Sequence, residues 1–304
     1  MPDQILRALA YDNLVRVYVG TTTSLVEASR AIHDTWPTAT AALGRALTAA
    51  ALMATMRDTE ERLTLQIMGG GPVGRIVTVA TGTGEVKGYM DEPHVDLELN
   101  RLGKLDVSGA VGKEGNLYII RDIGMREPYR GIVRLVSGEI GEDIAHYFLS
   151  SEQTRSAVAL GVKVDPTGNV LGAGGYIIQL MPGADEKLAA ELEKNLTSVP
   201  DISTLVANGE NEKAILERLV GDGQPSNLET IPLYLTCHCD REKFIGPLIS
   251  LGVDELISMA EEVHDTELVC HFCRSTYYFS PEELRAMAKQ ASAKNISENH
   301  LEAE

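Results

Sequence analysis

The chain has 304 residues, of which 44% are hydrophobic and 23% are charged, and its formal net charge at pH 7 is −17. This length allows two domains, or one large domain with a small appendage, and the hydrophobic content excludes a chain that is disordered over long stretches. The excess of acidic residues disfavours a nucleic-acid-binding protein, because phosphate backbones are bound by clustered Lys and Arg.

The N-terminal sequence, MPDQ, has no basic region followed by an apolar core, so no secretory signal is predicted. The most apolar stretch, residues 39–56, is rich in alanine and contains Arg45, which favours a buried helix over a membrane span. We therefore expect a cytoplasmic protein with no membrane partner, in a compartment where thiols stay reduced.

Residues 1–183 are predicted to form a core domain of strands and turns around one or two helices. Alternating apolar and polar residues predict strands, at 14–19, 63–67 and 75–79. A helix is predicted to begin with Thr38 as its N-cap and to run to about Met56. The glycines at 69–71 lack a following Gly-Lys-Ser/Thr, so they indicate a turn rather than a phosphate loop. The glycines at 172, 174 and 175 are predicted to allow close backbone packing at the end of a strand.

After Met181-Pro182-Gly183 the pattern changes to short amphipathic helices. A stripe of Leu188, Leu192 and Leu196 predicts the first, and shorter apolar stripes predict two more, near 202–206 and 215–220. Helices this short depend on a surface to pack against. Residues 184–230 are therefore predicted to be a helical linker docked on the core, and the alternative interpretation is a linker whose docking can be released. The part from 184 onward holds 10 Lys/Arg and 23 Asp/Glu, a net of −13, against −4 for residues 1–183.

All four cysteines lie in one 37-residue window, as Cys237-His238-Cys239 and Cys270-His271-Phe272-Cys273. Free cysteines that only filled core space would be scattered along the chain. Two close pairs separated by a thirty-residue insert are typical of a chain that brings four sulfurs to one tetrahedral Zn²⁺. The two histidines inside the loops are predicted to lie outside the ligand set, because four thiolates complete the tetrahedron.

The spacing of the cysteines also indicates redox chemistry. Structural zinc sites favour C-x₂₋₄-C at both ends, whereas the first pair here is C-x-C. Cys237 and Cys239 can also close a very small disulfide ring, and Cys270 and Cys273 have the CxxC spacing of reversible dithiols. Each zinc-binding pair is therefore also a potential disulfide, which favours a switch over a permanent structural site.

Residues 231–304 are predicted to form a small C-terminal module around these cysteines. Strands are expected at 233–235, 267–269 and 276–279, and helices at 242–251 and 254–263, with a kink or break at Pro247. Ser280-Pro281-Glu282-Glu283 is a strong helix start, with Ser280 as the N-cap. The predicted fold class is α+β: a strand-rich mixed α/β core domain, a helical linker and a small zinc-binding module.

Several motifs resemble one known family, the bacterial redox-regulated heat-shock chaperones, also called 33 kDa chaperonins. The C-x-C and C-x-x-C pairs with their insert resemble the zinc switch of that family. Segments in the first 183 residues are similar to its core-domain signatures: HDTWPT at 33–38, AALGR at 41–45, GGGPVG at 69–74, SSEQ at 150–153 and GGYIIQLMPG at 174–183. The resemblance covers nearly the whole chain.

The resemblance implies an ATP-independent holdase rather than an enzyme. In the reduced state, one Zn²⁺ per chain is expected on Cys237, Cys239, Cys270 and Cys273, and the protein is expected to be inactive. Oxidation is expected to form the disulfides Cys237–Cys239 and Cys270–Cys273, release zinc, unfold the module and linker, and expose a surface for unfolded client proteins. A homodimer is the expected active form, and nucleic acid and membranes are not expected partners.

Three other classes of protein are compatible with the cysteine pattern. A zinc-ribbon nucleic-acid-binding protein would show salt-dependent RNA binding, and a thiol-disulfide oxidoreductase using Cys270 and Cys273 would turn over in an insulin-reduction assay. An enzyme with a merely structural zinc would need a catalytic site in the core domain. The histidines there, His33, His94 and His146, are scattered and form no recognisable nucleophile–base set.

Overall fold

The computed structural model describes residues 2–57, 61–124, 127–262 and 264–301, with side chains described as far as residue 292. Contacts between Cα atoms divide the chain into two compact units, residues 1–236 and 237–304. The predicted domain limits at residues 183 and 230 stay predictions. The fold class is confirmed: strand-rich sheets combine with helices, and the four cysteines gather in the C-terminal region.

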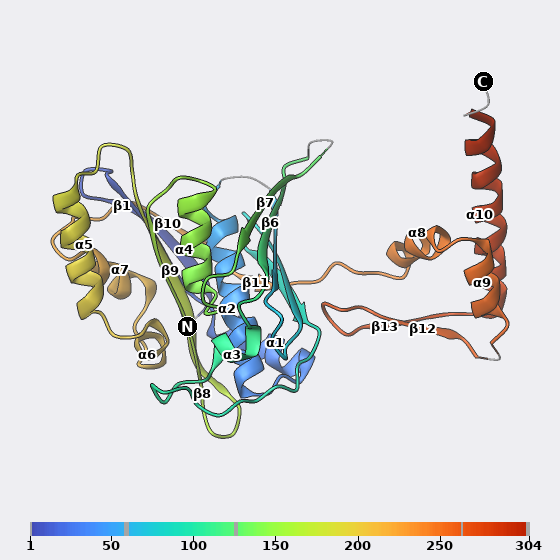
Figure 1. Ribbon diagram of the computed structural model, residues 1–304, viewed down its shortest axis with the longest axis horizontal. Coiled ribbons are helices and arrows are strands. Elements are labelled where there is room, and N and C mark those ends of the chain that lie inside the picture. Colours follow the sequence, from blue (N-terminus) through green and yellow to red (C-terminus); the bar gives the residue numbers. More distant parts are fainter. Residues whose placement is uncertain (1, 58–60, 125–126, 263, 302–304) are drawn as a thin grey trace. The chain divides into compact units, whose positions relative to one another are not determined.

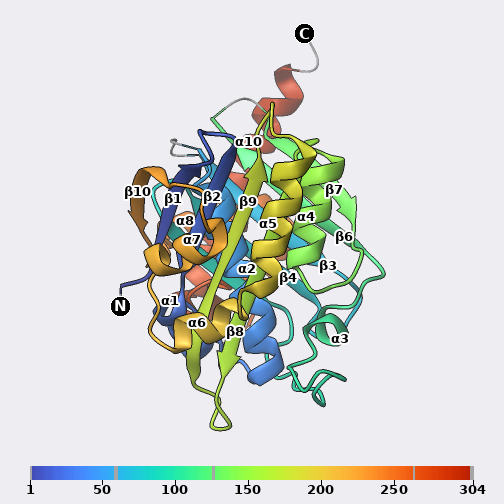
Figure 2. The same ribbon diagram turned by 90° about the vertical axis from the view of Figure 1, so that its left-hand side faces the viewer.

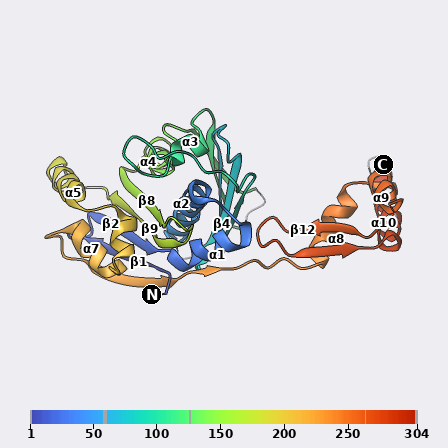
Figure 3. The ribbon, with the colours of Figure 1, turned by 90° about the horizontal axis from the view of Figure 1, so that it is seen from below.

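Two sheets form the first unit, with helices packed between them (Figures 1 and 3). Sheet A is antiparallel, in the order β10-β1-β2-β9-β8, with β1 (Gln4–Ala10), β2 (Val15–Thr21), β8 (Ser156–Val164), β9 (Val170–Leu180) and β10 (Ser226–Pro232). Sheet B has the order β11-β5-β4-β3-β6-β7, with β3 (Arg62–Met68), β4 (Arg75–Thr81), β5 (Glu85–Met90), β6 (Asn116–Asp122), β7 (Tyr129–Arg134) and β11 (Tyr234–Leu235). Only β11 pairs in parallel with its neighbour, β5, among the strands described.

Helix α2 (Pro37–Ala54) lies between the two sheets and packs against strands of both. Its many alanines leave room for two close sheets, and almost every one of its residues is buried. The other helices of this region are α1 (Thr23–His33), the short α3 (Val107–Val111) and α4 (Gly141–Ser150). The prediction of a buried helix here is confirmed, and no helix in the described parts of the chain is long and apolar enough to span a membrane.

The predicted N-cap of α2 is wrong. Trp36 occupies that position and Pro37 is the first helical residue, which suits proline because its missing N–H has no partner in the first turn. The hydroxyl of Thr38 instead donates to the Asp96 carboxylate (2.9 Å) and accepts from the Leu97 backbone N–H (3.1 Å). It therefore ties the helix to the loop that follows β5.

The two glycine predictions are confirmed. Gly69 and Gly71 form a turn between strands β3 and β4, where a Cβ atom would lie within 2.4 Å of backbone oxygens of the α3 segment. Within β9, a Cβ on Gly172 would lie 2.6 Å from backbone atoms of a neighbouring helix, α6 (Ile202–Ala207). Both sites need close backbone approach, and neither is a phosphate loop.

The predicted linker helices cover the outer face of sheet A (Figure 2). They are α5 (Glu186–Ser198), α6 (Ile202–Ala207) and α7 (Glu212–Val220). Their apolar stripes form a second core with residues of β1, β2 and β9; its helical members are Leu192, Ile202, Leu205, Ile215, Leu216, Leu219 and Val220. Three helices are confirmed, and β10 and β11 then continue the chain along the edges of the two sheets.

The second unit has its own small core. It contains α8 (Glu242–Ser250), α9 (Val253–Ala260), the hairpin β12 (Thr266–Val269) and β13 (Thr276–Phe279), and α10 (Pro281–Leu301). Ser280 caps α10 as predicted, because its hydroxyl accepts from the Glu283 N–H (3.3 Å) and its own N–H donates to the Glu283 carboxylate (2.9 Å). Pro247 lies inside α8 without ending it. The buried members of this core are Leu248, Leu256, Ala260, Phe279, Leu284, Met287, Ala288 and Ala291.

Candidate metal centre

Two loops of the second unit carry the cysteines. Cys270 and Cys273 lie on the tight turn between β12 and β13, which is closed by backbone bonds from the Cys270 N–H to Ser275 (2.9 Å) and from the Arg274 N–H to Cys270 (2.9 Å). Arg274 adopts a left-handed conformation with a φ of 60° to complete the turn. Cys237 and Cys239 lie on the loop that precedes α8. The hairpin and this loop together present four sulfurs to one point.

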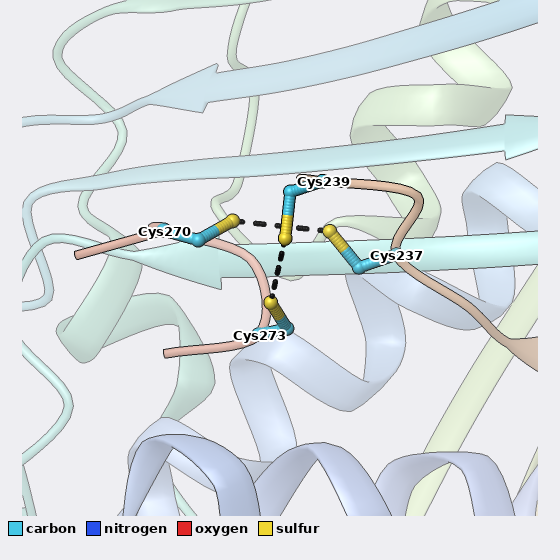
Figure 4. Close-up of side chains that lie close together, drawn as sticks. All are labelled: Cys237, Cys239, Cys270 and Cys273. Carbon is cyan, nitrogen blue, oxygen red and sulfur yellow. Dashed lines mark hydrogen bonds between the residues drawn. The ribbon is translucent and has the colours of Figure 1, made fainter. Parts of the chain in front are cut away.

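The four sulfurs gather closely (Figure 4). The sulfurs of Cys237 and Cys270 are 3.8 Å apart, those of Cys239 and Cys273 are 3.2 Å apart, and all four lie within 4.8 Å of one another. Four thiolates about 2.3 Å from one Zn²⁺ would place neighbouring sulfurs about 3.8 Å apart in a tetrahedron. The donor set and its spacing therefore fit a four-thiolate zinc site.

Burial and hydrogen bonding give the thiols different acidities. Burial raises the pKa of Cys239 to about 12. A hydrogen bond from Tyr277 opposes this rise, and hydrogen bonds with the other thiols add to it. Burial also disfavours the thiolate of Cys273, but hydrogen bonds from Ser275 and from the other thiols outweigh it and lower its pKa to about 6. A metal ion binds thiolates, so zinc binding here would displace the proton that burial holds on Cys239.

Residues outside the cysteine pairs hold the loops in place. Arg241, two residues after Cys239, donates to the Glu283 carboxylate on α10 (2.6 Å) and to the Tyr278 carbonyl (3.1 Å). Its guanidinium also lies 4.3 Å from the centre of the Phe279 ring. These contacts join the first cysteine loop to the hairpin and to α10.

Two hydroxyl groups that were not predicted from the sequence lie beside the sulfurs. Tyr277 lies 3.3 Å from the Cys239 sulfur, and the Cys273 sulfur lies 3.3 Å from the Ser275 hydroxyl. Alternation along β13 would have placed Tyr277 on the same face as Phe279, but only the folded hairpin brings it to the cluster.

The histidines lie where the sequence suggested. His238 and His271 are exposed, and the cluster consists of the four cysteines alone. In the first unit, His33 is buried on α1, and His94 lies 3.1 Å from the Asp34 carboxylate. His146 lies on α4. These three form no cluster with one another in the described structure.

The fold and the cysteine cluster define a class of protein with a strand-rich core domain and a small module whose four cysteines could bind zinc. Comparisons with known proteins identify the family. A family model described as "Hsp33 protein" matches residues 3–280. The "33 kDa chaperonin" of Geobacillus sp. (strain WCH70) is 46% identical over 97% of this chain and all of its own. That of Bacillus subtilis (strain 168) is 44% identical over 95% of this chain and 99% of its own.

A solved structure gives the same result. The crystal structure of the 33 kDa chaperonin (heat shock protein 33 homolog) from Thermotoga maritima matches with a TM-score of 0.89 and 38% identity, over 96% of this chain and 100% of that one. The chain belongs to the Hsp33 family of 33 kDa chaperonins, and the resemblance seen in the sequence is confirmed. This membership supports a chaperone role.

Proposed function

We propose that the protein is a redox-regulated, ATP-independent holdase that prevents aggregation of unfolded proteins during oxidative stress. The observation that carries this proposal is the cluster of four thiols within 4.8 Å, built from two pairs whose members are separated by only one or two residues. One arrangement thus serves both as a zinc site and as two potential disulfides. Family membership supports the chaperone part of the proposal.

In the reduced state, Cys237, Cys239, Cys270 and Cys273 would hold one Zn²⁺, which crosslinks the loop before α8 to the β12–β13 hairpin. A structural zinc ion contributes on the order of 10–16 kcal/mol to a small module. That is comparable with the stability of a whole domain. The core of the second unit is small, and small domains often depend on such a crosslink. Zinc is therefore proposed to keep the module folded.

Oxidation by hydrogen peroxide would remove the ligands in pairs. A thiolate sulfur attacks one peroxide oxygen, the O–O bond breaks and hydroxide leaves; the neighbouring thiolate then attacks the oxidised sulfur, so that the S–S bond forms and a second hydroxide leaves. Each disulfide takes two electrons from the protein. Once Cys270 and Cys273 or Cys237 and Cys239 are joined, two of four ligands are lost and the remaining pair holds the ion weakly.

The linker helices are proposed as the next segment to be released. A cavity of about 550 Å³ lies beneath α5, between that helix, α4 and strands β8 and β9. Leu192 is the only buried residue among the described residues of α5. The helix is also held by Tyr11, whose hydroxyl donates to the Val220 carbonyl (2.6 Å) and lies 3.1 Å from the Glu191 carboxylate. A loosely packed helix of this kind opens at low free-energy cost.

Release would expose two apolar surfaces, the helical stripes and the outer face of sheet A. Their residues, now buried in the second core, would bind unfolded clients or a second copy of the chain, and a homodimer is proposed as the active form. The net charge of −13 after residue 183 would keep this exposed state in solution. The cytoplasm, where thiols are reduced until stress occurs, is the proposed compartment.

The proposed switch predicts a specific disulfide pairing. Treatment of the zinc-loaded protein with peroxide should release one zinc, consume four thiols and join Cys237 to Cys239 and Cys270 to Cys273. In the folded cluster the cross-pairs 237–270 and 239–273 are in contact, so proximity alone does not select the partners. The two cysteines of each local pair share one short loop, so they stay close together when an oxidised sulfur moves away from the cluster, and this favours the local disulfide. Peptide mapping with zinc and thiol counts tests this. Mainly Cys237–Cys270 or Cys239–Cys273 products would contradict the local switch.

A further inference from the structure

Tyr277 lies beside the first cysteine pair and contacts Cys239. It lies on β13, opposite Leu268 of β12, and its ring packs against Phe244 with the ring centres 5.0 Å apart. Its hydroxyl oxygen lies 3.3 Å from the Cys239 sulfur and 3.2 Å from the Cys239 backbone carbonyl oxygen. The packed ring therefore holds one hydroxyl group against both the side chain and the backbone of a single cysteine.

The direction of these hydrogen bonds depends on the state of the sulfur. A thiolate has no proton, so in the metal-binding form only the Tyr277 O–H can donate, and it shares its hydrogen between the sulfur and the carbonyl of Cys239. A disulfide sulfur is a weak acceptor without the negative charge. The bond to sulfur therefore stabilises the reduced thiolate form more than the oxidised form.

We propose that Tyr277 is a positioning residue that shields the Cys239 sulfur and slows its reaction with electrophiles and oxidants. This inference rests on the proposed function of the cluster as a redox switch. The hydrogen bond withdraws electron density from the attacking sulfur, and the bond to the carbonyl keeps the C-x-C loop in its ligand conformation. Tyr277 thereby sets how readily Cys239, and not the other cysteines, begins to react.

The neighbouring residues provide matched controls. Tyr277→Phe removes the hydroxyl and keeps the ring that packs against Phe244. Tyr278→Phe removes a hydroxyl from the next position of the same strand, where the side chain is 54% exposed. Ser275→Ala removes the hydroxyl that contacts the Cys273 sulfur (3.3 Å), and it serves as the reciprocal variant.

The test measures the nucleophilicity of each sulfur without any oxidation. The zinc-loaded full chain and the three variants are checked for equal zinc content and treated with limiting iodoacetamide, whose methylene carbon is attacked by the thiolate as iodide leaves. Peptide mapping then gives the alkylation rate of each cysteine. Tyr277→Phe should alkylate about tenfold faster at Cys239 and much less so at Cys273, the effect expected for losing one hydrogen bond to a charged group. Ser275→Ala should show the reverse selectivity, and Tyr278→Phe should match the unmodified protein.

A second measurement separates this inference from the proposed function. Zinc release by hydrogen peroxide should also be faster in Tyr277→Phe than in Tyr278→Phe. An unchanged Cys239 alkylation rate in Tyr277→Phe, or an equal increase at all four cysteines, would overturn the inference regardless of how fast peroxide releases zinc. Faster alkylation at Cys239 with no zinc release by peroxide in any variant would support the shielding role and contradict the switch.

Discussion

Peroxide oxidation is expected to remove hydrogen-exchange protection from residues 231–288 and from helices α5, α6 and α7, while strands β1–β9 keep theirs. The reason is the distribution of stability along the chain. In the proposed switch, the module depends on a zinc contribution of about 10–16 kcal/mol, whereas sheet A, sheet B and α2 share a large core of their own. Loss of the metal should therefore unfold the module in one step and spread back along the chain to the loosely packed α5.

Hydrogen exchange followed by mass spectrometry can locate this boundary. Protection should be lost after about Gly183 and kept before it. Returning the oxidised sample to reducing conditions with zinc provides the control and should restore the original pattern. Protection retained throughout the oxidised chain, together with client binding, would mean that linker release is not the mechanism and that a preformed surface binds clients.

Replacing any one of the four cysteines by serine is expected to lower the zinc affinity by about a hundredfold or more. In the proposed site, four ligands would share a binding free energy of about 10–16 kcal/mol, so losing one thiolate should cost roughly 3 kcal/mol. Competition with a chromogenic chelator measures this for Cys237→Ser, Cys239→Ser, Cys270→Ser and Cys273→Ser. His238→Ala and His271→Ala are the controls, because both side chains are exposed and lie outside the cluster. A cysteine whose replacement leaves the affinity unchanged would drop out of the ligand set.

The features that were predictable from the sequence are encoded locally. The two close cysteine pairs, the Ser280 capping box and the leucine stripe of α5 each depend on residues within a few positions of one another. The four cysteines do gather at one point, Ser280 does cap α10, and α5 is a helix. The alanine-rich stretch likewise predicted a buried helix, because no surface helix would be so apolar all round.

Features that depend on distant parts of the chain were missed. The Thr38 hydroxyl was assigned to a cap, but it bonds to Asp96 and Leu97, far along the chain. Strand β10 is mostly exposed and shows no clear apolar alternation, and pairing with β1 fixes it in place. Tyr277 appeared only as one residue of a return strand, because its contact with Cys239 exists only when the hairpin and the loop before α8 come together.

The central claim is that oxidation of this cluster turns the protein into a holdase, and the suppression of client aggregation tests it most directly. A thermally unfolded client is followed by light scattering, without ATP, in the presence of the reduced zinc-loaded protein or of the peroxide-oxidised protein. The oxidised protein should suppress scattering near a one-to-one ratio, the reduced protein should not, and a chain with all four cysteines replaced by serine should give the same result with and without peroxide. Equal suppression by the reduced zinc-loaded and oxidised forms, or none by either, would contradict the account.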